Sequence, residues 1–476
     1  MIINNYVIND KPLNKSWTHG IFMKIVSSQA SYISKESIDL LNIYKGKDKD
    51  LDDAEKLWKS LLIDAISILK INDSREKIYQ DLKKDRHITR ENFDKIRKTS
   101  SFGIDELSKY LHDFVEYESV LYGTNKFYRD HINHVFQVWA IGVVILSNYD
   151  FQLNDKFVIN KKYDFHFQIP QSNKSKKIAI SKSEIWAMWI VISLCHDLGY
   201  PIEKSSKINK QTKKILSYFG NIQFTELDFN FNMLNSFLVQ KLLNIISSRI
   251  SSQKNETSDN SKFHTSIQPK YQDKLSKSLE ENKHGIFSSL LLFKSLTFFL
   301  ETDYYMGDKA LESEDARQLY IRKEILRSIA GHTCPKLYHL RLDTLSFLLI
   351  LCDELQEWNR PSFESYTNKN KEKEPSVKIK NVSFQKTEQE IHIEMIYETE
   401  KKGDYENYLI RNKFMNIHYL LRSAVGDKNR MMIFIWDIYV GDVKYQFTFD
   451  SKKHTFEQLN ILKTKHGVSE EFELYN

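Results

Sequence analysis

The chain has 476 residues, of which 69 are basic and 63 acidic, so its formal net charge is +6. Because this small excess is spread over the whole chain, composition argues against a dedicated nucleic-acid-binding protein. The sequence shows no apolar run of membrane-spanning length, no secretory signal and, with three cysteines, no disulfide framework. We therefore expect a cytoplasmic protein of two or three domains that contacts no membrane.

Residues 1–111 are polar and helical in pattern, and apolar positions at helical spacing predict a helix over 54–71. They carry no chemical motif, so we interpret them as a helical N-terminal region that serves as a cap or in oligomerisation. At the other end, a charged linker over 367–375 precedes a small α+β region, 376–476. Its expected strands cover 376–384, 390–397, 430–439 and 443–449, and its expected helix covers 408–425.

Residues 112–362 hold every feature of chemical interest and predict a helical bundle. The expected helices cover 134–146, 183–195, 286–300, 321–330 and 344–358. Two polar insertions, at about 149–182 and 247–283, interrupt the bundle. Alternation over 163–169 predicts a hairpin strand in the first, and the Ser-, Lys-, Asn- and Gln-rich second one predicts a surface loop. The predicted fold class is mainly α with a small α+β appendage.

A His-Asp pair, His196-Asp197, stands at the end of the strongly apolar helix expected over 183–195. A helix that is apolar on all sides is buried, and a buried imidazole and carboxylate must find partners. Gly199 and Pro201 follow at once and read as a helix stop. A metal ion would satisfy both side chains. The alternative pairs Asp197 with an arginine and leaves His196 as a hydrogen-bonded core residue.

Three more histidines and one aspartate occupy similar places on apolar helices: His134, His284, His332 and Asp353. Each histidine alone is more often a core residue than a ligand, whereas a lone acid in an apolar helix is costly unless it is paired or coordinated. Neutral imidazoles and carboxylates are the ligands that intermediate divalent metals prefer. Four such histidines and two aspartates in one region favour a metal site inside the bundle.

The order His, His-Asp, His, His, Asp resembles the HD phosphohydrolase superfamily over about residues 127–360. Three segments carry the resemblance: 129–138 (RDHINHVFQV), 195–201 (CHDLGYP) and 351–356 (LCDELQ). The resemblance implies an HD-type helical bundle with one or two divalent metals per chain, for which Mn, Fe, Co, Ni, Zn and Mg are all candidates.

The resemblance also implies how the ligands divide. The first metal would be held by His134, His196, Asp197 and Asp353. Asp197 would bridge to a second metal, held by His284 and His332. Binuclear members of the family often have a doubled histidine at the fifth position, whereas this chain has Gly331-His332-Thr333.

Hydrolysis of a phosphate ester needs an acid for the leaving oxygen and cations for the phosphate charge. His131 lies one turn before His134 on the same helix face and is a candidate proton donor. Arg129 and Lys204 are candidates for binding phosphate, and Asp197 would act beside the attacking water. The alternatives are a hydrogen-bonding residue behind the ligands for His131 and a solvated lysine before a polar loop for Lys204.

The resemblance implies a nucleotide phosphohydrolase, with deoxynucleoside triphosphates as the first substrate class. It also implies a homo-oligomer, and a nucleotide effector or partner protein could act through the flanking regions. Some members of the family defend bacteria against phage by depleting nucleotides. The complete ligand set favours a second interpretation, a phosphodiesterase for cyclic nucleotides, cyclic dinucleotides or short oligonucleotides. A third is a non-catalytic binding module with a structural metal. Nucleic acid is not an expected partner, because aromatic residues on the C-terminal strands are more typical of a core.

Overall fold

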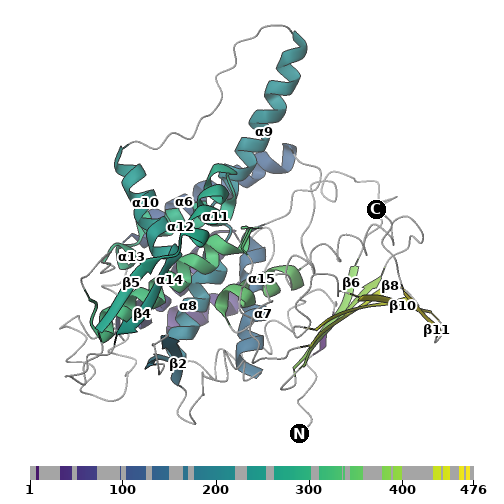
Figure 1. The fold of residues 1–476 in the computed structure, drawn as a ribbon. Helices are drawn as coiled ribbons and strands as arrows, with labels where there is room; N and C mark the ends of the chain where they lie inside the picture. The colour runs from purple at the N-terminus through teal and green to yellow at the C-terminus, as the bar shows by residue number, and fades with distance from the viewer. Residues whose placement is uncertain are drawn as a thin grey trace.

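The protein is mainly α-helical, as predicted, and a β-sheet accompanies the helices in this computed structural model (Figure 1). The structure describes residues 7–9, 33–44, 51–71, 97, 103–124, 131–148, 164–169, 176–219, 233–253, 262–301, 310–334, 336–337, 344–356, 378–386, 390–398, 433–440, 443–450, 460–465 and 468–471.

All five predicted core helices are present. They are α7 (Ile132–Asn148), α8 (Lys182–Cys195), α12 (His284–Ser295) with the short α13 (Thr297–Leu300), α14 (Ser313–His332) and α15 (Leu345–Leu355). Helix α8 packs against α7, α14 and α15. Its N-terminus carries a capping box, in which Ser181 Oγ accepts from Glu184 N and the Glu184 carboxylate accepts from Ser181 N. Because α8 is capped at one end and buried along its length, its other end is held firmly inside the bundle.

Three N-terminal helices join this bundle. They are α2 (Lys35–Ile43), α3 (Leu51–Ile71) and α6 (Ile104–Thr124). Helix α3 confirms the helical pattern over 54–71 and packs on α8, where Trp58 Nε1 donates to Leu194 O over 2.9 Å. The predicted limit at residue 111 falls inside α6.

Helix α9 (Tyr200–Leu216) begins three residues after Asp197 and was not predicted. Gly199 and Pro201, which we read as a helix stop, also start a new helix, because proline fits the first helical turn. The 3-10 helix η2 (Ser217–Phe219) extends α9, which projects from the rest of the protein in Figure 1. The alternative for Lys204, a solvated lysine before a polar loop, is therefore wrong about the loop, because Lys204 lies within α9.

The two predicted insertions both contain regular structure. Their elements are β2 (Asp164–Ile169) and β3 (Lys176–Ser181) in the first, and β4 (Ser248–Gln253), β5 (Lys262–Ile267) and α11 (Pro269–Glu280) in the second. The β2–β3 hairpin confirms the strand predicted over 163–169. The surface loop predicted over 247–283 is wrong, because the buried side chains of Ile250, Phe263 and Leu275 anchor a hairpin and a helix there. Helix α10 (Met233–Ser247), which leads into this segment, was not predicted either.

Seven strands form one sheet in the order β1-β6-β7-β8-β9-β10-β11. They are β1 (Val7–Asn9), β6 (Lys378–Lys386), β7 (Glu390–Glu398), β8 (Ile433–Val440), β9 (Val443–Asp450), β10 (Asn460–Lys465) and β11 (Val468–Glu471). Strands β7 and β8 pair in parallel, and the other pairs are antiparallel. The four predicted strands are confirmed. The predicted linker 367–375 and helix 408–425 lie outside the described residues.

One helical segment, 183–219, is long and apolar enough to cross a membrane by length and composition alone. This finding differs from the expectation that no run reaches that length. A buried core helix passes the same test, and 83% of the most apolar window of this segment is buried inside the protein. The segment is weak evidence for a membrane span.

Candidate metal centre

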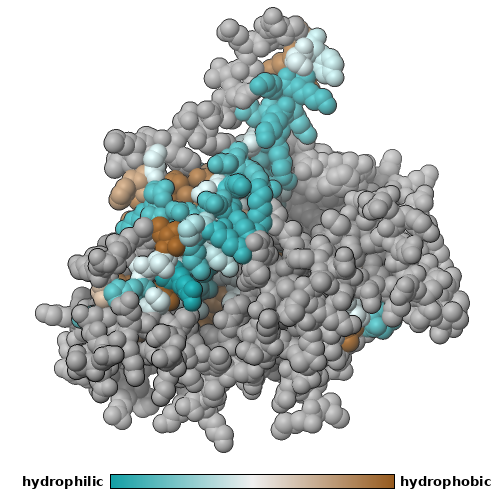
Figure 2. All heavy atoms as spheres, viewed as in Figure 1, coloured by the Kyte–Doolittle hydropathy of each residue, from teal (hydrophilic) through white to brown (hydrophobic). Residues whose placement is uncertain are grey.

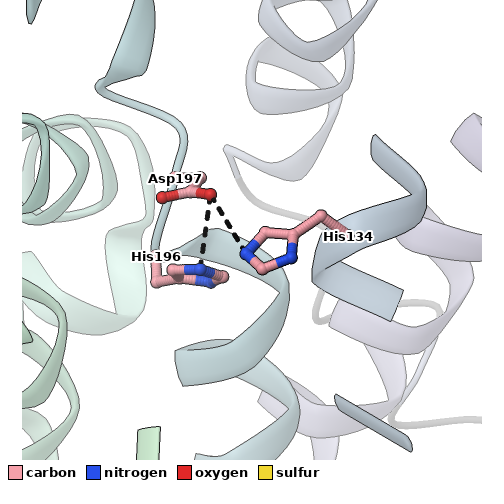
Figure 3. Close-up of side chains that lie close together, drawn as sticks. All are labelled: His134, His196 and Asp197. Atoms are coloured by element: carbon pink, nitrogen blue, oxygen red, sulfur yellow. Dashed lines mark ion pairs between the residues drawn. The ribbon is translucent and has the colours of Figure 1, made fainter. Parts of the chain in front are cut away.

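Five helices bring the six predicted metal ligands together. The ligands are His134 in the first turn of α7, His196 and Asp197 just after α8, His284 at the start of α12, His332 at the end of α14 and Asp353 on α15. Figure 3 shows three of them, with the carboxylate of Asp197 directed at the rings of His134 and His196. Residues up to 219 positions apart in sequence thus share one site.

The first group forms around one oxygen of Asp197. Its Oδ2 lies 3.6 Å from His134 Nε2 and 3.4 Å from His196 Nε2 (Figure 3). Asp353 joins this group, with its Oδ1 2.9 Å from His134 Nε2. Both imidazoles are fully buried, whereas the Asp353 side chain is 37% exposed. The Asp353 side of the group is therefore open to solvent.

The second group forms around the other oxygen of Asp197. Its Oδ1 lies 3.1 Å from His284 Nε2 and 3.7 Å from His332 Nε2, and these two nitrogens are 3.1 Å apart. In each group of two histidines and Asp197, one ligand atom per residue lies within 4.8 Å of the others. Asp197 belongs to both groups and turns one oxygen to each, as a bridging carboxylate must.

The four histidines all use their second ring nitrogen, Nδ1, in the same way. It lies 2.5–2.8 Å from an oxygen acceptor: Gln356 Oε1 for His134, Ser193 O for His196, Glu203 Oε2 for His284 and Ile329 O for His332. Because these oxygens only accept, Nδ1 carries the proton, and in a neutral ring Nε2 keeps its lone pair. Proteins orient metal-binding imidazoles by this kind of contact.

This donor set fits a divalent metal ion. Imidazole nitrogens and carboxylate oxygens suit metals such as Mn, Fe, Co, Ni and Zn. Moreover, His196 Nε2 is buried and makes no hydrogen bond within the described part of the chain. A buried polar atom in that state is costly unless something coordinates it. The protein therefore has a helical fold with two His/Asp groups that could hold a metal, which is compatible with the HD type.

The electrostatics of the centre also favour a bound cation. Burial opposes the charged form of Asp197, but His196, His284 and His332 outweigh it and hold the pKa of this carboxyl well below its usual value. Burial likewise opposes the charged form of His284, yet its hydrogen bonds to Asp197 and Glu203 raise its pKa to about 9. Positive charge is thus stabilised beside Asp197, and a divalent ion on the Nε2 side of His284 could supply it.

Two glycines allow the helices to approach closely enough to form the centre. A Cβ at Gly199 would lie 2.2 Å from His284 O, so α12 could not pack on the turn that holds Asp197. A Cβ at Gly285 would lie 2.5 Å from Ile329 O, which would separate α12 from α14. Since His284 begins α12, both contacts determine where its ring lies.

Two hydrogen-bonding residues behind the ligands were missed in the sequence. Glu203, on α9, accepts from both the backbone N and Nδ1 of His284, at 3.1 and 2.7 Å. Gln356 accepts from His134 Nδ1, and its amide nitrogen donates to Gln137. Gln356 lies one turn after Asp353, where a polar residue ending an apolar helix was a usable signal. No sequence signal indicated Glu203, because α9 itself was not predicted.

Of the predicted catalytic residues, Asp197 lies in the centre itself, and His131 and Lys204 lie at its edge. His131 is buried, and its Nδ1 lies 2.8 Å from a carboxylate oxygen of Glu118. Its ring lies against that of Tyr200, with 3.8 Å between centroids, and the ammonium of Lys204 lies 4.6 Å above the Tyr200 ring. Neither His131 nor Lys204 belongs to the two His/Asp groups that could hold a metal. Arg129 is outside the described residues.

Comparison of the chain with protein families, with curated proteins and with solved structures found no match. The chemical interpretation of the centre therefore depends on its residue types and its geometry.

Proposed function

We propose that the protein is a metal-dependent phosphohydrolase of the HD type that acts on nucleotides. The observation that carries this proposal is the Asp197 carboxylate, which turns one oxygen to each of two pairs of histidines. The first pair and Asp353 would hold one divalent ion, the second pair would hold another, and Asp197 would contact both. When bound, two such ions lower the pKa of a coordinated water and neutralise charge on phosphate oxygens.

Protein side chains would supply the remaining chemistry. Because Glu118 accepts from Nδ1 of His131, the opposite nitrogen is the atom that can give a proton to a leaving oxygen, and the carboxylate stabilises the imidazolium. Lys204 provides a positive charge beside Tyr200 for the phosphates of the substrate. A substrate would approach the first group from Asp353, because its side chain is 37% exposed and the two histidines of that group are buried.

Deoxynucleoside triphosphates are the first candidate substrates. One water would release inorganic triphosphate and leave the deoxynucleoside, whereas release as single phosphates would take three successive hydrolyses. This activity fits a cytoplasmic homo-oligomer that depletes nucleotides during phage infection. A nucleotide effector or a partner protein would control it. A phosphodiesterase is the second candidate. The second group favours this candidate. Nε2 of His332 lies 3.1 Å from Nε2 of His284, so the group forms although the chain has no doubled histidine at the fifth position.

The test is turnover of dNTPs, NTPs, cyclic nucleotides and short oligonucleotides with Mn, Co or Mg, with products separated by chromatography. Triphosphate or phosphate with nucleoside supports the first candidate, and a linear nucleotide supports the second. Asp197→Asn should abolish turnover. The control is His112→Ala, which changes a histidine on α6 that is 57% exposed. Equal turnover by wild type and Asp197→Asn would refute both candidates.

A further inference from the structure

Helix α9 leaves the metal centre as an exposed, strongly basic arm. Its five lysines are Lys204, Lys207, Lys210, Lys213 and Lys214. Its one acidic residue, Glu203, already contacts His284 and Lys207. No further Asp or Glu occurs before Glu226. The arm therefore concentrates positive charge in a way that the net charge of the whole chain does not reveal.

The lysines form a row along one side of the helix. At 3.6 residues per turn, Lys207, Lys210 and Lys214 fall within about 60° around the helix axis. The steps of three and four residues between them correspond to about 4.5 and 6 Å along the axis. Figure 2 shows the result as a continuous hydrophilic column on the projecting arm. The row starts at the metal centre, because Lys204 lies above Tyr200, whose ring is 5.4 Å from that of His284.

The far end of the arm exposes apolar and aromatic side chains. Ile215 is 60% exposed, Tyr218 82% and Phe219 73%. The first turns of α9 pack on α6 and α12, but no residue of α9 or η2 is fully buried, and most side chains from Lys207 onward are exposed. The outer part of the helix therefore gains little from tertiary packing, and clustered exposed aromatic side chains mark interaction sites. Both observations call for a partner that covers the arm.

We propose that α9 and η2 bind single-stranded nucleic acid and lead it to the metal centre. The lysine row is complementary to a chain of backbone phosphates, and the rings of Tyr218 and Phe219 can stack on unpaired bases. A duplex hides the faces of its bases, so the aromatic tip favours a single strand. Binding to the arm is independent of the proposed hydrolase, whereas delivery of the strand to the centre rests on it. This partner was not expected from composition, which averages the charge over the chain.

The test is fluorescence anisotropy with a fluorescein-labelled oligothymidylate of about 20 nucleotides, long enough for one binding site. Wild type should bind with a strong salt dependence between about 50 and 200 mM NaCl. In Lys210→Glu/Lys214→Glu, affinity should fall roughly tenfold or more, and the slope of log K against log salt should shrink by about 1.4. Tyr218→Ala/Phe219→Ala should also weaken binding roughly tenfold.

The matched control is Lys35→Glu/Lys56→Glu, which makes the same charge change at exposed positions of α2 and α3. It should bind like wild type, and so should Asp197→Asn, which keeps the arm intact when the centre is disabled. The proposal is overturned if Lys210→Glu/Lys214→Glu binds like wild type, if the control loses as much affinity, or if a duplex of equal length binds better. Loss of turnover in Asp197→Asn without loss of binding keeps the two proposals separable.

Discussion

A single carboxylate, that of Asp197, faces all four histidines of the centre, and each histidine is held from behind by an oxygen acceptor. Of these acceptors, the one on Glu203 belongs to a charged side chain. Glu203→Gln keeps the shape but removes the charge that supports His284, so we expect metal affinity of the second group to fall roughly 10- to 100-fold. Calorimetric titration with Mn or Zn measures this, with Glu280→Gln on α11 as the exposed control. Unchanged affinity would contradict the assigned role of Glu203.

His131 gives a separate prediction, because it lies beside the ligands without belonging to them. If it donates a proton to the leaving group, His131→Asn should lower kcat by roughly 10²- to 10⁴-fold and remove one limb of the pH–rate profile. Metal content should not change. A fall in metal content equal to the fall in kcat would show instead that His131 only supports the ligands.

For single residues, the sequence indicated which side chains belong to the centre but gave little information about the atoms that hydrogen-bond to them. His134, His196, Asp197, His284 and Asp353 could be selected because polar groups at buried helix positions need an explanation. Of their hydrogen-bond acceptors, only Gln356 could have been selected, because a backbone carbonyl carries no sequence signal and Glu203 depends on the position of a helix that was missed.

Helix contacts hold the two His/Asp groups together, and glycine makes the closest contact possible. In Gly285→Ala the new methyl group would lie 2.9 Å from His332 Nδ1 as well as against Ile329 O, so α12 and α14 must separate. We expect a loss of about 1–3 kcal/mol in unfolding free energy and weaker metal binding by the second group. Gly331→Ala is the matched control, because its methyl group would meet only Leu337 Cδ1, at 3.2 Å. Equal effects in urea unfolding would contradict this reading of the contact.

Helix α14 also buries a cation whose effect on stability depends on pH. Burial, reinforced by Arg327, lowers the pKa of Lys323 to about 8, and Glu324 only partly opposes this. Between about pH 8 and 10.5 the folded protein loses this proton before the unfolded chain does, so the unfolding free energy should rise with pH. Lys323→Met should be more stable by up to about 3 kcal/mol at pH 7, and the advantage should vanish by about pH 10.5. A constant difference across this range in denaturant titrations would contradict the assigned pKa.

Among the helices and strands, strong periodicity decided what could be predicted. Helices α7, α8, α12, α14 and α15 were foreseen because their apolar residues are dense. Helix α9 was missed because it is polar and has no fully buried residue. The β4–β5 hairpin was missed because only isolated apolar residues, such as Phe263, anchor this polar segment to the core. Local composition cannot show which few side chains tertiary packing will use.

Over the whole molecule, the centre lies where helices from distant parts of the chain meet, and both of its groups depend on Asp197, so a change at Asp197 should remove metal from both. Metal content per chain, measured by mass spectrometry after loading with Mn, Co or Zn and removal of excess ion, tests this most directly. We predict about two ions in wild type, about one in His284→Ala and close to none in Asp197→Asn, since two groups share that carboxylate. No bound metal in wild type, or equal content in wild type and Asp197→Asn, would contradict a shared metal centre.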